Sequence, residues 1–265
     1  MFFKRRHTKS RTQIAGYLAL GLYLLTGCGY VERGEEARGS GTFIFPVNAG
    51  CDDVEVYTAD TETEKRMRAL GLLDIREVDP SIEVCLMYAT AENFLRKPLY
   101  KDIRKAFALP ETVLRLADAQ RRLKAVRPDL HLLIYDAARP MQVQQEMWNR
   151  VKGTEKRVYV SNPKNGGGLH NYGAAVDLTL ADSLGNALPM GCDFDYFGEE
   201  ARPDCEEDML KQGRISPDHL YNRCLLRKVM TEAGFRVLPS EWWHFNLMSR
   251  EEARRREVKR IDYRL

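Results

Sequence analysis

The chain has 265 residues, of which 44% are hydrophobic and 30% are charged, so it is long enough for one sizeable domain and is not typical of a disordered protein. Its formal net charge is +3, but five of the 41 basic residues and none of the 38 acidic residues stand before residue 28. The remaining chain therefore carries 36 basic and 38 acidic residues, a net charge of −2, which gives no indication of a nucleic-acid partner.

Residues 1–27 have the layout of an export signal. A basic start, MFFKRRHTKSR, precedes an apolar stretch over 14–25 that is too short to span a bilayer comfortably. The stretch ends in LLTGC, which resembles the lipobox of bacterial lipoproteins and implies cleavage before a lipidated Cys28. This resemblance predicts a periplasmic protein with a lipid anchor, and Gly29 in place of aspartate favours the outer over the inner membrane. An ordinary secretory signal or an uncleaved short anchor is the alternative.

Five cysteines follow Cys28, and an exported protein can keep disulfides. Because five is odd, at least one thiol stays free or pairs elsewhere. There is no CxxC pattern, so we expect no cysteine zinc cluster. Cys192 and Cys205 flank a short polar loop, and the sequence favours a bridge between them.

The rest of the chain divides by composition into three parts. Residues 28–70 contain the lipidated cysteine and a segment rich in glycine and charge, which we interpret as a tether. The folded domain is predicted over 71–250, and 251–265 is a charged tail or helix. The pattern makes no prediction of an oligomeric state.

Short strands and longer helices alternate in the predicted domain. Apolar periodicity and turn residues predict, in chain order, strands over 81–90, 130–137, 174–181 and 241–247, and helices over 111–126, 139–151 and 216–235. In the last helix Asp218 is the expected N-cap and Gly234 the expected left-handed end. The strands are too few and irregular for a doubly wound sheet. The fold class is therefore α+β, with a small, mostly antiparallel sheet flanked by helices in a single domain.

Two pairs of residues could carry metal chemistry: His170 with Asp177, and Glu241 with His244. A catalytic zinc takes three protein ligands and keeps one position open, and it works beside a carboxylate that accepts a proton from water. Residues three or seven apart on an ideal strand point to opposite faces, so each pair needs a turn or bend, and Gly173 offers one.

Asp177 is the most informative of these residues, because a carboxylate inside an apolar strand is costly unless a cation or hydrogen bonds compensate it. A hydrogen-bonded core histidine is the alternative for any single histidine, and it is the interpretation we give to His131 and His219. Arg139 follows a buried strand at the start of a helix, where a guanidinium could stabilise an oxyanion; a surface salt bridge or a contact at the helix start is the alternative.

Several ordered motifs resemble the D-alanyl-D-alanine dipeptidase family of zinc peptidases, which is related to the D,D-carboxypeptidases. The resemblance runs from YATAENF at Tyr88 to EWWHF at Glu241. It comprises DAARP around Arg139, HNYGAAVD from His170 to Asp177, MGCDFDYF around Asp195, and the EWWH element.

The resemblance implies a role for each matching residue. His170, Asp177 and His244 are implied to hold one Zn2+ per domain. Glu241 is implied to be the general base that activates the metal-bound water, and Arg139 to stabilise the tetrahedral intermediate. Asp195 and Tyr88 are implied to hold the ammonium end of a small peptide substrate.

The implied function is zinc-dependent hydrolysis of D-alanyl-D-alanine, or a similar small D,D-dipeptide, in cell-wall peptide metabolism. The sequence departs from the family at Gly168, where a serine hydroxyl is usual and is expected to help bind the substrate. One alternative is a D,D- or L,D-carboxypeptidase that trims longer peptidoglycan peptides. Another is a non-catalytic envelope lipoprotein that binds peptidoglycan, which a missing ligand or a missing Glu241 would indicate; none is missing.

Overall fold

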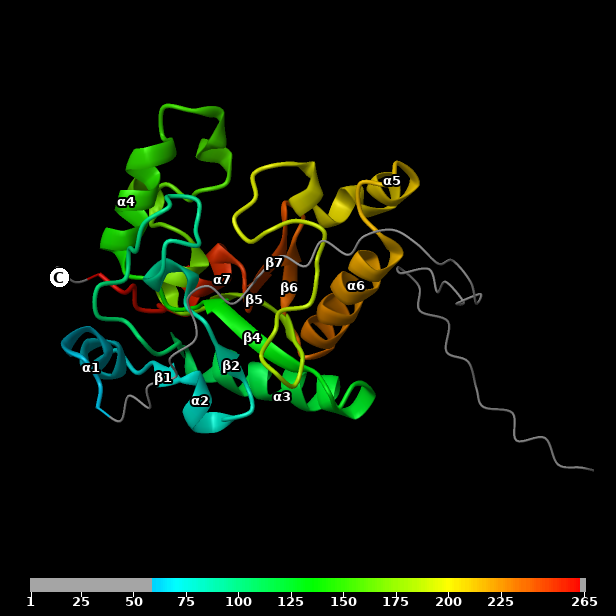
Figure 1. Cartoon of the computed structure of the whole chain (residues 1–265). Helices are drawn as coiled ribbons and strands as arrows, with labels where there is room; N and C mark the ends of the chain where they lie inside the picture. The colour runs from blue at the N-terminus through cyan, green and yellow to red at the C-terminus, as the bar shows by residue number, and fades with distance from the viewer. Residues whose placement is uncertain (1–58, 263–265) are drawn as a thin grey trace, which may run out of the picture. The chain divides into compact units, whose positions relative to one another are not determined.

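The structure is a computed structural model that describes residues 59–262. Two sheets lie among helices and short 3-10 turns (Figure 1). The α-helices are α1 (Glu62–Ala69), α2 (Ile75–Val78), α3 (Pro110–Val126), α4 (Met141–Val151), α5 (Glu206–Lys211), α6 (Pro217–Glu232) and α7 (Arg250–Arg255). The strands are β1 (Leu73–Asp74), β2 (Glu83–Val84), β3 (Phe107–Ala108), β4 (His131–Asp136), β5 (Ala175–Ala181), β6 (Arg236–Leu238) and β7 (Glu241–Asn246). The 3-10 turns are η1 (Met87–Ala89), η2 (Glu155–Val158), η3 (Pro163–Asn165), η4 (Leu169–Tyr172), η5 (Glu199–Ala201) and η6 (Pro203–Cys205).

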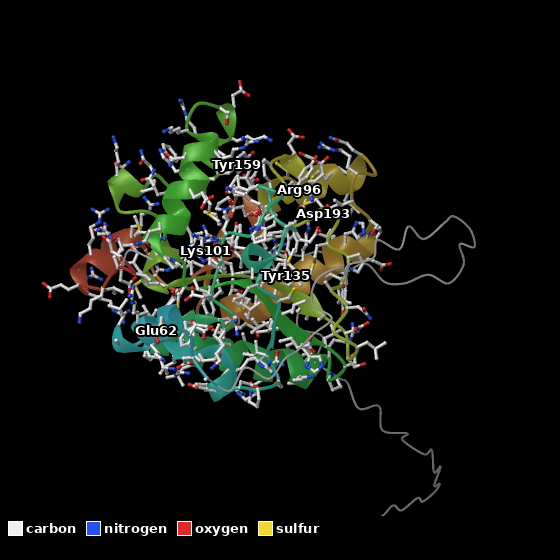
Figure 2. The ribbon with its side chains drawn as sticks, turned by 60° about the vertical axis from the view of Figure 1, so that its left-hand side comes forward. Glu62, Arg96, Lys101, Tyr135, Tyr159 and Asp193 are labelled. Carbon is white, nitrogen blue, oxygen red and sulfur yellow. The ribbon has the colours of Figure 1, made fainter. Side chains whose placement is uncertain are left out.

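The main sheet has five strands in the order β2-β4-β5-β7-β6, and only the β2–β4 pair is parallel. Helices α3 and α6 pack against each other and against this sheet, while β1 and β3 form a separate antiparallel pair. Charged side chains such as that of Glu62 project outward around the ribbon (Figure 2). The predicted α+β class and the mostly antiparallel sheet are confirmed.

The long predicted elements are confirmed to within a few residues, because their apolar faces are buried. Val113, Leu116 and Leu123 of α3 are wholly covered, and β5 is buried along its full length. Gly234 follows α6 with a φ of +95°, as expected. The predicted N-cap was wrong: Ser216 caps α6 through a hydrogen bond from the backbone N–H of His219 to its Oγ, because Pro217 already occupies the first helical position.

The strand predicted over 81–90 is shorter than expected. Only Glu83 and Val84 pair with β4, and the chain then turns into η1. This turn buries Tyr88 against Tyr100 and Phe194. The apolar residues after Val84 are therefore buried in a loop and do not extend the edge strand.

The packed unit extends beyond residues 71–250 on both sides. Met67 of α1 is fully buried, and so is Ile261, whose carbonyl accepts a hydrogen bond from the backbone N–H of Met141. The predicted signal and Cys28 lie outside the described residues. Within 59–262, no helix combines the length and the apolar character needed to cross a membrane.

The predicted bridge between Cys192 and Cys205 is wrong, since both are free thiols. Cys192 is held beside Arg223, whose Nη2 lies 3.6 Å from its sulfur, and burial raises the pKa of the Cys192 thiol to about 11. Cys205 instead follows Asp204 on the exposed turn η6. Cys85 and Cys224 are the described cysteines that take part in disulfide bonds.

Candidate active site

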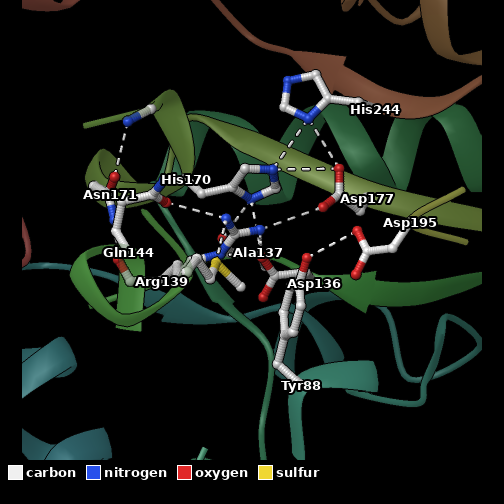
Figure 3. A network of polar contacts seen from close by, with 12 residues as sticks. Tyr88, Asp136, Ala137, Arg139, Gln144, His170, Asn171, Asp177, Asp195 and His244 are labelled. Atoms are coloured by element: carbon white, nitrogen blue, oxygen red, sulfur yellow. Dashed lines mark hydrogen bonds and ion pairs between the residues drawn. The ribbon is translucent and has the colours of Figure 1, made fainter. Parts of the chain in front are cut away.

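His170, Asp177 and His244 meet in one cluster although they come from η4, β5 and β7 (Figure 3). Nε2 of His170 lies 3.1 Å from Nδ1 of His244, and Oδ1 of Asp177 lies 3.3 Å and 2.9 Å from these two nitrogens. Asp177 and His244 are direct neighbours across the β5–β7 pair, so the register of the sheet places them together.

The remaining ring nitrogens have other partners. Nδ1 of His170 donates to the carbonyl oxygen of Ala137 at 2.8 Å, and Nε2 of His244 donates to Oδ1 of Asn246 at 2.9 Å. These bonds leave lone pairs on Nε2 of His170 and Nδ1 of His244, which face Asp177. Ligand atoms about 2 Å from a tetrahedral ion are separated by roughly 3.3 Å, so the three atoms fit one zinc-sized ion.

A left-handed residue turns the chain between His170 and Asp177, as the sequence required. Gly173 has a φ of +65°, and its carbonyl accepts a hydrogen bond from the backbone N–H of Leu109. A Cβ at this position would lie 3.1 Å from the nitrogen of Leu109, which is backbone and cannot move easily. This turn brings His170 of η4 back to Asp177, near the N-terminal end of β5.

A bulge in β7 brings the side chains of Glu241 and His244 together, as the turn at Gly173 does for His170 and Asp177. Val237 pairs with Phe245, but the next residue of β6, Leu238, pairs with Glu241, so β7 carries extra residues between the two pairs. Trp242 turns toward Arg223 of α6, whereas Glu241, Trp243 and His244 all line the cavity. The bulge therefore places two side chains three apart on one face of the sheet.

Glu241 is enclosed beside the cluster. One carboxylate oxygen lies 3.9 Å from Nδ1 of His244. Burial is the main cause that raises the pKa of Glu241 to about 8, with a further contribution from the negative charge of Asp177. A carboxylate with such a pKa can both accept and return a proton near neutral pH.

Arg139 is buried and held on several sides. Its Nε and Nη2 donate to one oxygen of Asp136 at 2.9 Å and 2.5 Å, and Nη1 donates to Oε1 of Gln144 at 3.1 Å. Its guanidinium carbon also lies 4.8 Å from the centre of the Tyr88 ring, and Nη2 lies 3.6 Å from Asp177. The guanidinium thus points at the cluster in a fixed orientation (Figure 3).

Sequence reasoning missed Asp136, Gln144 and Asn246. A bulge near the end of β4 brings Asp136 opposite Asp177, and Tyr100 donates a hydrogen bond to it. Asp136 stands in the same DAARP motif as Arg139, and Asn246 stands two strand positions after His244. These positions relative to Arg139 and His244 could have indicated Asp136 and Asn246 from the sequence. Gln144 carried no comparable signal.

Asp195 and Tyr88 lie together at one side of the cavity. The Tyr88 hydroxyl donates to Oδ1 of Asp195 at 3.0 Å, and Asp195 has a φ of +59°, which is uncommon for a residue with a side chain. Burial, and secondarily the charge of Asp177, raises the pKa of Asp195 to about 7. The hydroxyl of Tyr88 and the backbone N–H of Phe94 hold the carboxylate in the cavity wall.

All seven residues singled out in the sequence line one cavity of about 410 Å³. Tyr159, labelled in Figure 2, adds an aromatic wall by stacking on Phe197 at 4.9 Å. The other two described histidines lie elsewhere: Nδ1 of His131 donates to the carbonyl oxygen of Ser81, and Nδ1 of His219 accepts from the backbone N–H of Ser216. Both are hydrogen-bonded and lie outside the cluster, as interpreted, but both are only partly buried, so the interpretation of core histidines was wrong in that respect.

An α+β domain that brings a His–Asp–His cluster, a buried glutamate and a buried arginine into one cavity defines a metallopeptidase. The model of the family described as D-ala-D-ala dipeptidase matches residues 68–260. The chain belongs to this family.

Named relatives agree with this assignment. The chain is 35% identical over 176 residues to D-alanyl-D-alanine dipeptidase of Escherichia coli (strain K12). This match covers 66% of this chain and 84% of the relative. It is 30% identical to the D-alanyl-D-alanine dipeptidase of Synechocystis sp., over 54% of this chain and 70% of the relative. The D-alanyl-D-alanine dipeptidase of Enterococcus faecium is 25% identical, and the match covers 67% of this chain and 92% of the relative.

Proposed function

We propose that this protein is a zinc-dependent dipeptidase that hydrolyses D-alanyl-D-alanine, or a similar small D,D-dipeptide, with one Zn2+ per domain. The observation that carries the proposal is the convergence of three ligand atoms, from His170, Asp177 and His244, within 4.8 Å of one another beside Glu241. Two imidazoles and one carboxylate with an open side form a donor set typical of catalytic zinc.

Zinc bound by these residues would supply Lewis acidity, which polarises the scissile carbonyl and makes a water molecule more acidic. Glu241 would accept the proton from that water and pass it to the leaving amine, a role that its position 3.9 Å from Nδ1 of His244 supports. Arg139 would stabilise the negative charge of the tetrahedral intermediate, since Asp136 and Gln144 already fix its guanidinium.

Asp195 and Tyr88 support a dipeptidase rather than a carboxypeptidase. Their paired carboxylate and hydroxyl form an acidic wall that suits the free ammonium of a dipeptide. An acylated peptide stem has no such charge, so it would gain nothing from Asp195.

We further propose a location in the periplasm, with a lipid anchor on Cys28 in the outer membrane. The support is the sequence before residue 28 alone. Replacing Cys28 by alanine should move the protein from the membrane fraction to the soluble fraction. An unchanged membrane fraction would contradict the anchor.

The test of the function uses the chain without residues 1–27, loaded with zinc. Release of D-alanine is followed from D-alanyl-D-alanine and from its N-acetyl form, with Glu241→Gln as an isosteric control. We expect the wild-type protein to cleave only the free dipeptide. We expect Glu241→Gln to bind zinc but to cleave neither substrate. Equal or faster cleavage of the acetylated form would indicate a carboxypeptidase, and full activity of Glu241→Gln would contradict the proposed base.

A further inference from the structure

The cavity contains three arginines that differ in their partners. Arg139 is paired with Asp136, and Arg236 is paired with Glu252 at 3.2 Å. Arg250 has no acidic partner among residues 59–262, and its side chain is exposed at the edge of the cavity. Its Nη2 instead donates to Oγ of Ser161 at 2.7 Å. Arg250 therefore offers a positive charge that the described protein does not neutralise.

Ser161 is fixed to the catalytic network. Its carbonyl oxygen accepts a hydrogen bond at 2.9 Å from Nε2 of Gln144, the residue whose Oε1 binds Arg139. Its hydroxyl lies 3.1 Å from where a Cβ on Gly168 would stand, two residues before His170. The hydroxyl thus lies in tight contact with the position that a side chain at residue 168 would occupy, in the wall next to the metal cluster.

Ser161 and Arg250 line the same cavity as Asp195. In Figure 3, Gln144 lies on one side of His170 and Arg139, and Asp195 lies on the other. Gln144 holds Ser161, and Ser161 in turn accepts a hydrogen bond from Arg250, so both residues line the same cavity as Asp195 and the metal cluster. The cavity thus contains a carboxylate, the metal cluster and a guanidinium without an acidic partner among residues 59–262.

We propose that Ser161 and Arg250 bind the C-terminal carboxylate of the peptide substrate, an inference that rests on the proposed dipeptidase function. A free dipeptide is a zwitterion, with an ammonium at one end and a carboxylate at the other. The guanidinium of Arg250 has N–H groups left to donate, and a fork of such donors matches a carboxylate. Ser161 accepts from Arg250 through Oγ, so its own hydroxyl hydrogen is available for a second bond to the substrate.

This assignment gives each end of the substrate its own determinant. Asp195 recognises the ammonium, and the Ser161–Arg250 pair recognises the carboxylate. Because Arg250 is exposed, salt in the solvent screens its contribution more than that of Asp195. The pair would select peptides that end one residue after the scissile bond.

The test compares D-alanyl-D-alanine with its C-terminal amide, which lacks the carboxylate charge. Both are assayed with the zinc-loaded wild-type chain without residues 1–27 and with Arg250→Gln, Ser161→Ala and Arg255→Gln. Arg255 is the matched control, since it is an exposed arginine on the same helix and does not line the cavity. KM and kcat are determined separately for each substrate.

We expect Arg250→Gln to raise KM for the free dipeptide about tenfold or more, with kcat changed much less. The same variant should leave KM for the amide unchanged, because the group that it would contact is already absent. Ser161→Ala should act in the same direction with a smaller effect. Arg255→Gln should match the wild type.

An equal change in KM for both substrates would mean that Arg250 supports the loop of Ser161 and does not bind the carboxylate, and would overturn the inference. So would an unchanged KM for the dipeptide. Failure of the proposed function gives another result: the wild-type protein would then cleave neither substrate, or Glu241→Gln would remain active.

Discussion

The proposed metal cluster and the two cavity walls proposed to bind the substrate are held in place by different means. Asp177 and His244 stand on neighbouring strands, so the backbone register of β5 and β7 fixes their separation. Asp195 and Ser161 stand on loops and are positioned by a few side-chain hydrogen bonds. A strand-borne group depends on the fold as a whole, while a loop-borne group depends on one or two neighbours. Changes in the cluster should therefore affect the chemistry, and changes in the walls should affect substrate recognition.

The largest effect should come from the cluster. Asp177→Asn removes a charged ligand while keeping its shape, so we expect loss of stoichiometric zinc and a fall in kcat of about 100-fold or more. Metal content is measured by elemental analysis beside the kinetics. Asp193→Asn is the control, because Asp193 is exposed and is not one of the clustered ligands. Full zinc content in Asp177→Asn would break the assignment of the cluster.

The next effect concerns the support of Arg139. Asp136→Asn weakens the charged partner of a buried guanidinium, so kcat should fall roughly tenfold to 100-fold, with KM changed less. Stability should fall too, since an unpaired buried charge is costly. Kinetics and thermal unfolding check this together. An unchanged kcat with a lower melting temperature would assign Asp136 to the fold alone.

The acidic wall predicts a dependence on pH. Burial raises the pKa of Asp195 to about 7, so the carboxylate is charged above this pH and becomes neutral as the pH falls through it. KM for the free dipeptide should therefore rise severalfold between pH 7.5 and pH 6, which lie about half a unit above and about one unit below that pKa. In Asp195→Asn this pH dependence of KM should be absent. A similar rise in KM in that variant would show that another group titrates.

The smallest effect on chemistry should come from the turn before β5. Gly173→Ala places a Cβ against backbone at a φ of +65°, so the free energy of unfolding should fall by about 2–3 kcal/mol. Gly213→Ala is the control: its φ is +70° but nothing lies within 4 Å, so about 1 kcal/mol is expected. Denaturant titration measures both. Equal losses would mean that backbone strain, and not the crowded position, sets the cost.

Much of the candidate site could be predicted from the sequence, because its residue types are constrained by chemistry. A carboxylate inside the apolar strand around Asp177 needs compensation, and the glycine at 173 offers the turn that brings His170 back to it. Periodicity also predicted α3, β4 and α6, whose apolar faces meet in the core. The cap of α6 could also have been predicted, because Ser216 directly precedes Pro217 at the first helical position, whereas the cysteine pairing depends on the tertiary surroundings of residues such as Cys192.

By itself, then, the sequence determined the chemical groups: two histidines, an acid and a glutamate in motifs that fold into strands and a turn. Only the tertiary structure decided their geometry. The bulge in β7 places Glu241 and His244 on one face, and the hydrogen bonds to Ala137 and Asn246 select which ring nitrogens face Asp177. Only the fold, likewise, sets the hydroxyl of Ser161 in front of Gly168 and beside Arg250. The physical reason is that bulges, ring orientations and contacts between distant loops arise from packing across the sheet, which local residue patterns do not encode.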